Sequence, residues 1–579
     1  MCGIYASIGK RTDAAQAVLT GLKILEYRGY DSWGVAYKEE GKSEMSVQKQ
    51  VGKIGDAVID SEIQSGIAIG HTRWATHGGV TQANAHPHLD CSKRLALVHN
   101  GIVENYTEIK ASLIAKGHVF LSETDSEVVI HAIEEACKSV SLQESVRMVF
   151  QALSGLNALV VSDAQNEEIV IVKRGSPLVL GKGDNTTLLA SDQLALAGHV
   201  QDICFLPDDV LVHLTKDSIV AIEVADNLPI DLAWEQIRIK ADDVSMGEFK
   251  HFTIKEICEQ PGILAFHANN RVFPEFSDGE IYFVGCGTAG VAGLFGSYAY
   301  AHYQQKHVSM YSGSEFEAFL PTVQANATVV FFSQSGETID LVQHAQKLKA
   351  KGVRIIAVVN RTTSTLARLA DQVIPLEAGP EQSVLSTKAF TAKMAVLLQM
   401  ASANGAGVDI KKAADEIATI TSAPYIEEHI QPISKVLSTT DHVFCLGREA
   451  YYPLALESAI KIKEITYIHA EGMAAGELKH GPLALITDGT PCIVFVPQGE
   501  GKDAMLSSTM EVKSRGGMIV GIAAENNPVF DWHIPVADCG MASPIAQITV
   551  IQLLAYTIAV ELGRDPDKPR NLAKSVTVR

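Results

Sequence analysis

Cys2 directly follows the initiator methionine, so removal of Met1 would leave a cysteine at the amino terminus. A terminal cysteine carries a thiol with a pKa of about 8.5 and a free α-amine with a pKa of about 7.7–8.0. The amine can therefore accept the thiol proton near neutral pH, so that nucleophile and base lie on one residue. Position alone favours a second residue without a chemical role, and the assignment depends on the motifs around it.

Three motifs supply the other groups that a thioester mechanism on glutamine requires. Asn100 and Gly101 of the HNG motif offer an amide and a backbone N–H for a developing oxyanion. Arg73 in HTRWATHG is a planar cation suited to the α-carboxylate, and Asp125 in ETDSE is an anion at the start of a predicted helix. Each motif alone also has a structural explanation, namely a turn, a salt bridge and a helix N-cap.

The segments CGI, LEYRGYDSWG, HTRWATHG, HNGIVEN and SETDSE together resemble the N-terminal-nucleophile glutaminase domain of class II amidotransferases, in the same order and spacing. The resemblance covers about the first 215 residues. It implies Cys2 as the nucleophile and Asn100 and Gly101 as oxyanion donors. The glutamine-binding residues that it implies are Arg73, Trp74, Thr76, His77 and Asp125.

The segment FFSQSGETID lies where a predicted strand turns into a predicted helix. Free N–H groups and the positive end of the helix dipole favour an anion at such a turn. A helix cap would need one hydroxyl, whereas this segment has three and a glutamine amide. The sequence therefore predicts a phosphate cradle made of Ser333, Gln334, Ser335 and Thr338.

Ionisable residues mark the later part of the chain. Glu457, Lys461 and Glu464 are spaced at i, i+4 and i+7 and share one face of a predicted helix. Their neighbours are apolar, so we expect burial that perturbs their pKa values, the alternative being a solvated ion-pair face. His480 lies in a predicted turn and Lys574 in a tail with little helix or strand signal, and position alone gives neither a chemical role.

VGCGT, SQSGET, STKAFT, ESAIKIKE, AAGELKHGPLAL and PRNLAKSVTV resemble the paired sugar-isomerase (SIS) domains of the isomerising glutamine:fructose-6-phosphate aminotransferases. With the glutaminase motifs, the resemblance covers essentially the whole chain. It implies that Lys574 forms a Schiff base with the open-chain ketose and that Glu464 moves a proton between C1 and C2. His480 would assist ring opening from the neighbouring subunit of a homodimer. The implied sugar-phosphate-binding residues are Thr288, Ser333, Gln334, Ser335, Thr338, Val384, Ser386, Glu457, Lys461, Arg570 and Ala573.

The implied reaction converts fructose 6-phosphate and L-glutamine to glucosamine 6-phosphate and L-glutamate, the first step of amino-sugar biosynthesis. Ammonia would pass through an internal channel gated near Trp74, and neither a metal nor an organic cofactor is implied. An imine requires an unprotonated amine, so we expect a desolvated pocket to lower the pKa of Lys574. A sealed passage would keep ammonia from being protonated or lost.

The chain departs from the family pattern after CGT, where Ala289 replaces the usual serine and Gly290 and Val291 replace bulkier residues. Losing one hydrogen-bond donor costs about 1 kcal/mol, which weakens phosphate binding without abolishing it. An enzyme that aminates another ketose phosphate in a specialised pathway is therefore an alternative. A sugar-phosphate-binding regulator and a glutaminase with a decayed acceptor half are two more, although Glu464 and Lys574 argue against the regulator.

A chain of 579 residues is too long for one core, and about three domains are expected. Residues 2–217 mix short β-rich runs with helical patterns, which predicts stacked sheets flanked by helices. The resemblance implies that this is the α+β N-terminal-nucleophile fold. Residues 218–260 are interpreted as a linker. Residues 261–412 and 430–569 alternate strands and helices in similar order, which predicts two duplicated α/β domains with parallel sheets. Residues 570–579 would form a catalytic tail.

Composition narrows the function classes. The formal net charge of −19 disfavours a nucleic-acid partner. The nine cysteines show no C-x-x-C and no ligand-like Cys/His spacing, so neither a disulfide framework nor a zinc site is predicted, and the cytoplasm is the expected compartment. The apolar stretch Ile545–Leu562 is interrupted by polar residues and predicts a buried helix, not a membrane span. The cysteines expected to be buried are Cys137, Cys204, Cys445 and Cys492.

Overall fold

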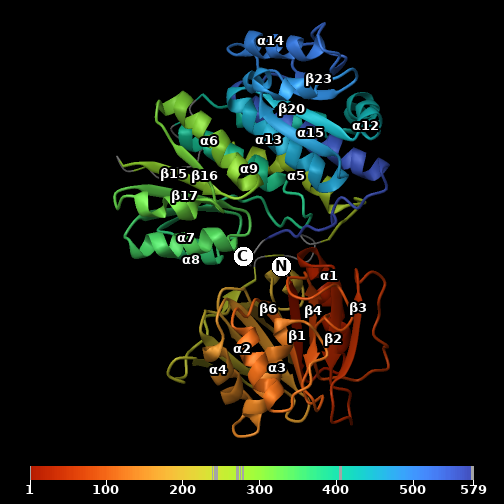
Figure 1. Cartoon of the computed structure of the whole chain (residues 1–579), viewed down its shortest axis with the longest axis vertical. Coiled ribbons are helices and arrows are strands. Elements are labelled where there is room, and N and C mark those ends of the chain that lie inside the picture. The colour runs from red at the N-terminus through yellow and green to blue at the C-terminus, as the bar shows by residue number, and fades with distance from the viewer. Residues whose placement is uncertain are drawn as a thin grey trace. The chain divides into compact units, whose positions relative to one another are not determined.

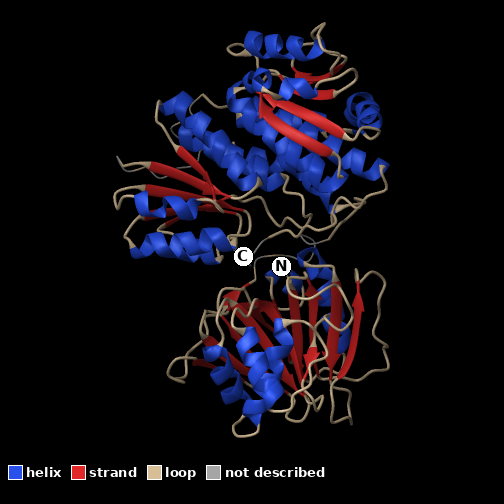
Figure 2. Cartoon of the chain, viewed as in Figure 1, coloured by secondary structure: helices blue, strands red, loops and turns tan. Residues whose placement is uncertain are grey.

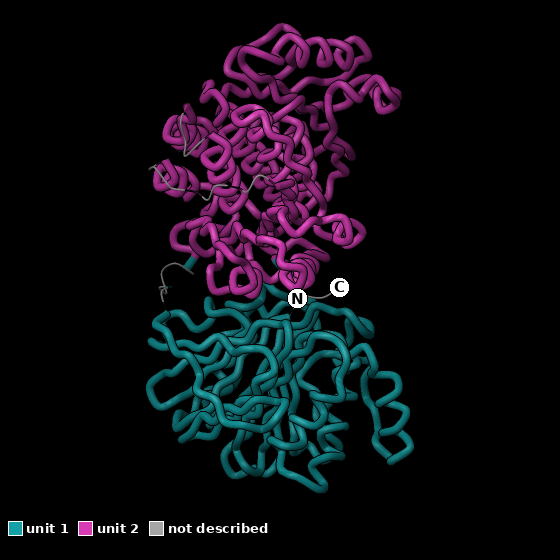
Figure 3. The backbone as a smooth tube through the Cα atoms, turned by 90° about the vertical axis from the view of Figure 1, so that its left-hand side faces the viewer, with its two compact units in different colours: residues 1–245, 575–579 teal, residues 246–574 magenta. Residues whose placement is uncertain are grey.

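The computed structural model describes residues 2–237, 239, 245–268, 273, 276, 279–402 and 407–575. The chain divides into two compact units, which Figure 3 distinguishes by colour. The first unit comprises residues 1–245 and 575–579, and the second comprises Met246–Lys574. Each unit has its own hydrophobic cores, so each is described by itself.

Two antiparallel sheets form the first unit (Figures 1 and 2). The larger sheet has the strand order β14-β11-β9-β10-β1-β4-β2-β3, and the smaller has the order β13-β12-β8-β7-β6-β5. The larger sheet comprises β1 (Gly3–Gly9), β2 (Ser32–Tyr37), β3 (Ser46–Val51), β4 (Ile67–Arg73), β9 (Val179–Gly183), β10 (Thr186–Ala190), β11 (Asp202–Phe205) and β14 (Glu235–Gln236). The smaller comprises β5 (His88–Leu89), β6 (Leu95–Gly101), β7 (Asn157–Asp163), β8 (Glu168–Lys173), β12 (Val210–Leu214) and β13 (Ile219–Glu223).

Alternating side chains of β1 show how these sheets are layered. Ile4 and Ile8 enter a core shared with Val98 and Val160 of the other sheet, whereas Tyr5 faces α1. The opposite face of the smaller sheet packs against α2, α3 and α4. The resulting order is helix, sheet, sheet, helix, which confirms the stacked sheets flanked by helices that the sequence predicts. These helices are α1 (Ala14–Leu25), α2 (Tyr106–Ala115), α3 (Asp125–Cys137) and α4 (Leu142–Ala152).

The second unit contains two five-stranded sheets in which every strand pairs in parallel. Their orders, β16-β15-β17-β18-β19 and β21-β20-β22-β23-β24, follow the same pattern along the chain. The parallel sheets predicted from alternating strands and helices are therefore confirmed. The strands are β15 (Ile281–Gly285), β16 (Ser309–Ser312), β17 (Thr328–Ser333), β18 (Arg354–Val359), β19 (Gln372–Pro375), β20 (His442–Gly447), β21 (His469–Ala474), β22 (Pro491–Phe495), β23 (Met518–Ala523) and β24 (Trp532–Pro535).

Helices α9 and α15 lie in the core of the second unit. Among the described helices, only the one spanning Gly540–Glu561 is long and apolar enough to cross a membrane, and 83% of its apolar window is buried inside the fold. The predicted buried helix is thus confirmed. The helices are α5 (Phe252–His267), α6 (Thr288–Gln304), α7 (Ile339–Ala350), α8 (Thr365–Leu369), α9 (Lys388–Ala401), α10 (Ile410–Ile420), α11 (Ala423–Tyr425), α12 (Gln431–Leu437), α13 (Tyr452–Thr466), α14 (Lys502–Lys513) and α15 (Ser543–Glu561).

The expected linker, residues 218–260, is not a separate segment. Strand β13 pairs with β12 and strand β14 pairs with β11, so both complete sheets of the first unit. Helix α5 packs against α9 and α10 in the second unit. The short alternation in β13 was obscured by the surrounding charged residues.

Burial of the cysteines follows the prediction except at one position. Cys204, Cys445 and Cys492 are buried, whereas Cys137 is half-buried because it ends α3, and all nine thiols are free.

Candidate active sites

Seven of the eight predicted glutaminase residues line a single pocket in the first unit. The eighth, Asn100, contacts Cys2 directly, because its Nδ2 donates a hydrogen bond to the Cys2 carbonyl at 3.1 Å. The pocket is built at one end of β1, β4 and β6 and at the start of α3. The seven residues are Cys2, Arg73, Trp74, Thr76, His77, Gly101 and Asp125.

The Cys2 thiol lies against the backbone of Trp74. The Trp74 N–H donates to Sγ at 3.2 Å, and the Trp74 ring packs edge-on against Tyr30 with centroids 6.3 Å apart. Burial raises the pKa of the Cys2 thiol, although the Trp74 N–H and the Arg73 charge act in the opposite direction. A thiol in this setting needs a base to remove its proton, which an α-amine on the same residue can supply.

His71 fixes the orientation of the Asn100 amide. Its Nε2 lies 3.1 Å from the His99 carbonyl and 3.1 Å from Asn100 Oδ1. A carbonyl can only accept, so this nitrogen carries the proton, and burial lowers the pKa of His71 to about 3, which keeps the ring neutral. Asn100 must therefore present its NH₂ group toward Cys2, as an oxyanion donor requires.

Gly101 requires the absence of a side chain. Its φ is +142°, and a Cβ there would lie 2.2 Å from the Leu156 carbonyl oxygen. Only glycine therefore lets the end of β6 approach the pocket closely.

Arg73 is buried and holds the loop that follows β4. Its guanidinium donates to the Gly79 carbonyl at 3.1 Å and to the Gly78 carbonyl at 3.2 Å. Burial lowers the pKa of Arg73, while the charges of Cys2, Asp31 and Asp125 raise it. The cation and the Asp125 carboxylate thus border the same pocket, as a site for a zwitterionic amino acid requires.

The helix cap at α3 is Thr124 and not Asp125. The Thr124 hydroxyl accepts the Glu127 N–H at 3.3 Å, whereas Asp125 is the first residue of the helix. The cap explanation for Asp125 is therefore wrong. Its carboxylate instead accepts the Val103 N–H at 2.8 Å and lies at the edge of the pocket.

In the second unit, the predicted charged face of α13 is buried. Glu457 and Lys461 have no exposed side-chain surface, and the Lys461 ammonium lies 2.6 Å from Glu464 and 3.4 Å from Glu457. Thr288, at the start of α6, donates to Glu457 at 3.0 Å and so joins α6 to α13. Burial raises the pKa of Glu457 to about 7, against the lowering effect of Lys461.

The Lys574 side chain is buried against the segment before α9. Its ammonium lies 2.6 Å from Glu381 and 3.3 Å from the Leu385 carbonyl, and Ser386 Oγ is 3.5 Å from the same carboxylate. Lys574 and Glu381 thus form a buried ion pair. The amine must first lose a proton before it can attack a carbonyl, and Glu381 is the acceptor at hand.

Tyr467 anchors the tail. Its hydroxyl accepts the Arg570 N–H at 2.8 Å, and the Arg570 guanidinium lies 4.2 Å from the centre of its ring. Val384 N donates to the Asp567 carbonyl at 3.1 Å, which fastens the segment before the tail to the Lys574 pocket. Ala573 is half-buried beside Lys574.

The predicted phosphate loop does connect β17 with the start of α7. Ser333 Oγ accepts the Gly336 N–H at 2.9 Å, and Ser335 Oγ accepts the Glu337 N–H at 3.2 Å. These two N–H groups are therefore engaged within the loop, and an anion would depend on the hydroxyls and on the half-buried Gln334 and Thr338 side chains. Gly336 has a φ of +67°, and a Cβ there would lie 1.9 Å from the Ser364 hydroxyl.

His480 is not brought into this site within the described part of the chain. It is exposed at the end of a 3₁₀ turn, Ala475–His480. No hydrogen bond or ion pair between described residues joins it to Glu464 or Lys574. The chain itself therefore does not supply the contact that the resemblance implies.

Sequence reasoning missed Glu381, Glu256 and Lys393. Glu256 accepts the Ser383 N–H at 3.1 Å, and burial raises its pKa to about 8. Lys393 is buried, and desolvation lowers its pKa to about 8 although Glu381 and Glu457 act against this. Charges of both clusters, Glu381 with Lys574 and Glu457 with Lys461, act on the Lys393 pKa. Glu381 lies in the segment PEQS and Lys393 in the segment KAFTAK, and neither segment has a local pattern that indicates a site.

Family models match both units. A glutamine amidotransferase domain matches residues 43–222, and a SIS domain matches residues 276–403 and again 436–560. The fold and the two sites therefore define a glutamine amidotransferase joined to a pair of SIS domains. The C-terminal domain of glucosamine-fructose-6-phosphate aminotransferase from Francisella tularensis is 32% identical, with a TM-score of 0.50, and the match covers 56% of this chain and 100% of that one.

Relatives that match over their whole length identify the family. The chain is 38% identical to glutamine–fructose-6-phosphate aminotransferase (isomerising) of Thermus thermophilus and 38% identical to the enzyme of that name from Pyrococcus horikoshii. Both matches cover 100% of each chain. The chain belongs to the family of isomerising glutamine–fructose-6-phosphate aminotransferases. These relatives lend no support to the alternative of a different ketose phosphate.

Proposed function

We propose that this chain transfers the amide nitrogen of L-glutamine to fructose 6-phosphate, yielding glucosamine 6-phosphate and L-glutamate. The observation that carries the proposal is the presence, in one member of the family, of a pocket lined by Cys2 and of a buried Lys574–Glu381 ion pair. The first suits amide cleavage and the second suits imine formation.

In the first unit, Cys2 Sγ attacks the glutamine amide carbon, and its proton passes to the α-amine of the processed chain. The Asn100 amide and the Gly101 N–H stabilise the oxyanion, and the amide nitrogen leaves as ammonia. Water then releases glutamate from the thioester. Arg73 and Asp125 bind the two charges of the glutamine head group, while Trp74, Thr76 and His77 shape the loop over the pocket.

In the second unit, Lys574 gives its ammonium proton to Glu381, 2.6 Å away, and the free amine forms an imine at C2 of the open-chain ketose, whose carbonyl oxygen leaves as water. Ammonia replaces the lysine at C2, and Glu464 transfers a proton between C1 and C2. The buried Glu457 and Lys461 hold the Glu464 carboxylate in place. The loop of Ser333, Gln334, Ser335 and Thr338 binds the phosphate, with Thr288, Val384, Ser386, Arg570 and Ala573 around the sugar.

We further propose a homodimer in which His480 assists ring opening at the neighbouring subunit. Its exposure on this chain supports that role. Ammonia would pass directly from the Cys2 pocket to the ketose, with Trp74 as the gate, and the nine free thiols suit the reducing cytoplasm. Residues 570–579 would act as the catalytic tail.

Two variants test the division of labour. Cys2→Ala should abolish glutamine-dependent synthesis, because no other described residue supplies the nucleophile. Lys574→Arg should stop sugar amination yet leave glutamine hydrolysis measurable. Glutamate and amino-sugar release would be assayed separately for each variant. Unimpaired synthesis by the first variant, or full amination by the second, would overturn the proposal.

A further inference from the structure

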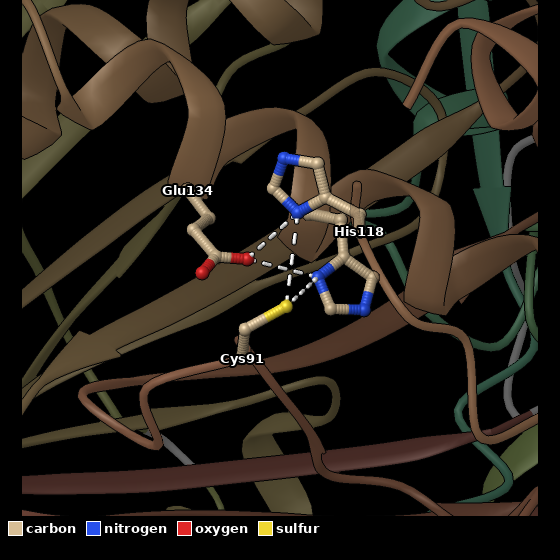
Figure 4. A group of neighbouring side chains, drawn as sticks. Cys91, His118 and Glu134 are labelled. Carbon is tan, nitrogen blue, oxygen red and sulfur yellow. Dashed lines mark hydrogen bonds and ion pairs between the residues drawn. The ribbon is translucent and has the colours of Figure 1, made fainter. Parts of the chain in front are cut away.

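A cluster of metal-binding side chains lies in the first unit at a point that the proposed glutaminase chemistry does not use. Cys91, His118, His131 and Glu134 each direct one ligand atom toward a common centre, and these four atoms all lie within 4.8 Å of one another. Figure 4 shows the Cys91 thiol, the His118 ring and the Glu134 carboxylate pointing toward the same space. We propose that the cluster is a zinc-binding site.

The spacing of the ligand atoms fits a tetrahedral ion. Cys91 Sγ lies 3.8 Å from His118 Nδ1 and 3.7 Å from His131 Nδ1. Glu134 Oε2 lies 3.1 Å and 2.9 Å from the same two nitrogens. Zinc bonds of about 2.0–2.3 Å at tetrahedral angles place neighbouring ligands roughly 3.3–3.6 Å apart. Small shifts would therefore seat one ion at the centre.

An outer carboxylate orients the His118 imidazole for metal binding. His118 Nε2 lies 3.1 Å from Glu135 Oε2, within hydrogen-bond distance, whereas His131 Nε2, 3.8 Å from Glu127 Oε1, is too far for a hydrogen bond. A neutral imidazole has one N–H, and giving it to the outer carboxylate turns the Nδ1 lone pair toward the centre. Metal-ligating histidines characteristically donate their other nitrogen to a carboxylate in this way.

The ligand set and its access favour zinc over the other common cations. A thiolate and two imidazoles are soft or borderline ligands, which Mg²⁺ and Ca²⁺ do not prefer. Cys91 is exposed, and Cys91 and His131 line a pocket of about 690 Å³ through which an ion can enter. The charges of a thiolate and a carboxylate would balance a divalent ion.

The site would fasten three segments of the chain. Cys91 follows β5, His118 precedes α3, and His131 and Glu134 lie on α3, which begins at Asp125. Since Asp125 borders the Cys2 pocket, the ion would stabilise the helix that carries a proposed glutamine-binding carboxylate. The role of the ion is structural, because none of the four ligands lines the pocket of the Cys2 thiol.

Zinc binding by the full-length chain tests the proposal. The experiment uses a Cys2→Ala background, since the Cys2 thiol could itself bind zinc. Equilibrium dialysis against Zn²⁺ should give about one ion per chain, and Cys91→Ser and His118→Gln should each weaken binding at least tenfold. Cys258→Ser removes a half-buried thiol of the second unit and should leave binding unchanged.

The absorption spectrum of bound Co²⁺ reports the ligands directly. Co²⁺ should give intense tetrahedral d–d bands and a thiolate charge-transfer band, and Cys91→Ser should lose the latter. Zn²⁺ should also raise the melting temperature of the parent and of Cys258→Ser, but not of Cys91→Ser. Binding well below one ion per chain, or equal binding after Cys91→Ser, would overturn the site. Neither result would bear on the proposed amidotransferase reaction, which is assayed with Cys2 intact.

Discussion

Glu381→Gln tests the buried Lys574–Glu381 ion pair, because it removes a charge while keeping the shape of the side chain. The wild-type carboxylate accepts from Lys574 at 2.6 Å and from the Thr387 N–H at 3.0 Å. Both charged side chains are almost fully enclosed, at 0% exposure for Glu381 and 4% for Lys574. In the variant, the ammonium would retain the Leu385 carbonyl, at 3.3 Å, and an amide oxygen.

The expected loss of stability in Glu381→Gln can be estimated in two ways. Removing one partner of a buried ion pair costs about 3–5 kcal/mol. Burial alone would raise the pKa of Glu381, but Lys574 and the Ala389 N–H lower it from 4.5 to about 2, which corresponds to about 3 kcal/mol. Because this pKa is lowered, the stabilisation is present above pH 4.5 and is lost as the pH falls toward 2.

Scanning calorimetry of the full chain measures the effect. Near neutral pH, Glu381→Gln should lower the free energy of unfolding of the second unit by about 3 kcal/mol. Lys574→Met should also destabilise it, and the double variant should recover most of the loss, because no buried charge is then left unpaired. Single variants that each cost less than about 0.5 kcal/mol, or that add without coupling, would refute the buried pair.

Three further predictions concern the two sites. Asn100→Ala should lower kcat for glutamine hydrolysis by about 10²–10³-fold, since one oxyanion donor is lost, and an unchanged kcat would exclude that role. Glu256→Gln should flatten the dependence of melting temperature on pH. Burial raises the Glu256 pKa to about 8, so the wild-type stabilisation is complete below pH 4.5 and declines as the pH rises through about 8, and parallel profiles would contradict this. Ala289→Ser, in the first turn of α6, should lower KM for fructose 6-phosphate about fivefold, equivalent to about 1 kcal/mol, whereas an unaltered KM would show that no phosphate donor is missing.

The fold was predictable where the period of the sequence is unambiguous. Strand β17, Thr328–Ser333, is buried along its whole length, and such continuous apolar runs between helical patterns indicate parallel sheets. The prediction of a linker over residues 218–260 missed β13 and β14, because both strands are short and lie in charged surroundings, where hydrophobic periodicity gives little signal. Long-range pairing with β12 and β11 decides their structure.

The candidate sites divide in the same way. Residues in compact motifs, such as Arg73 and Asn100, were predictable because the motif carries its own chemical logic. Glu381 was not, because its significance depends on Lys574, 193 positions away in sequence. The Cys91 cluster was hidden for the same reason, since only folding brings its thiol to the imidazoles. Contacts that close large loops leave no local pattern to read.

The transfer of nitrogen within one protein is tested most directly with glutamine labelled with ¹⁵N in its amide. Full-length enzyme would receive this glutamine and fructose 6-phosphate in the presence of unlabelled ammonium, and the products would be analysed by mass. We predict glucosamine 6-phosphate that carries the label, with one glutamate formed for each amino sugar. Labelled ammonia released without an amino sugar, or an amino sugar carrying the unlabelled nitrogen of the medium, would contradict the account.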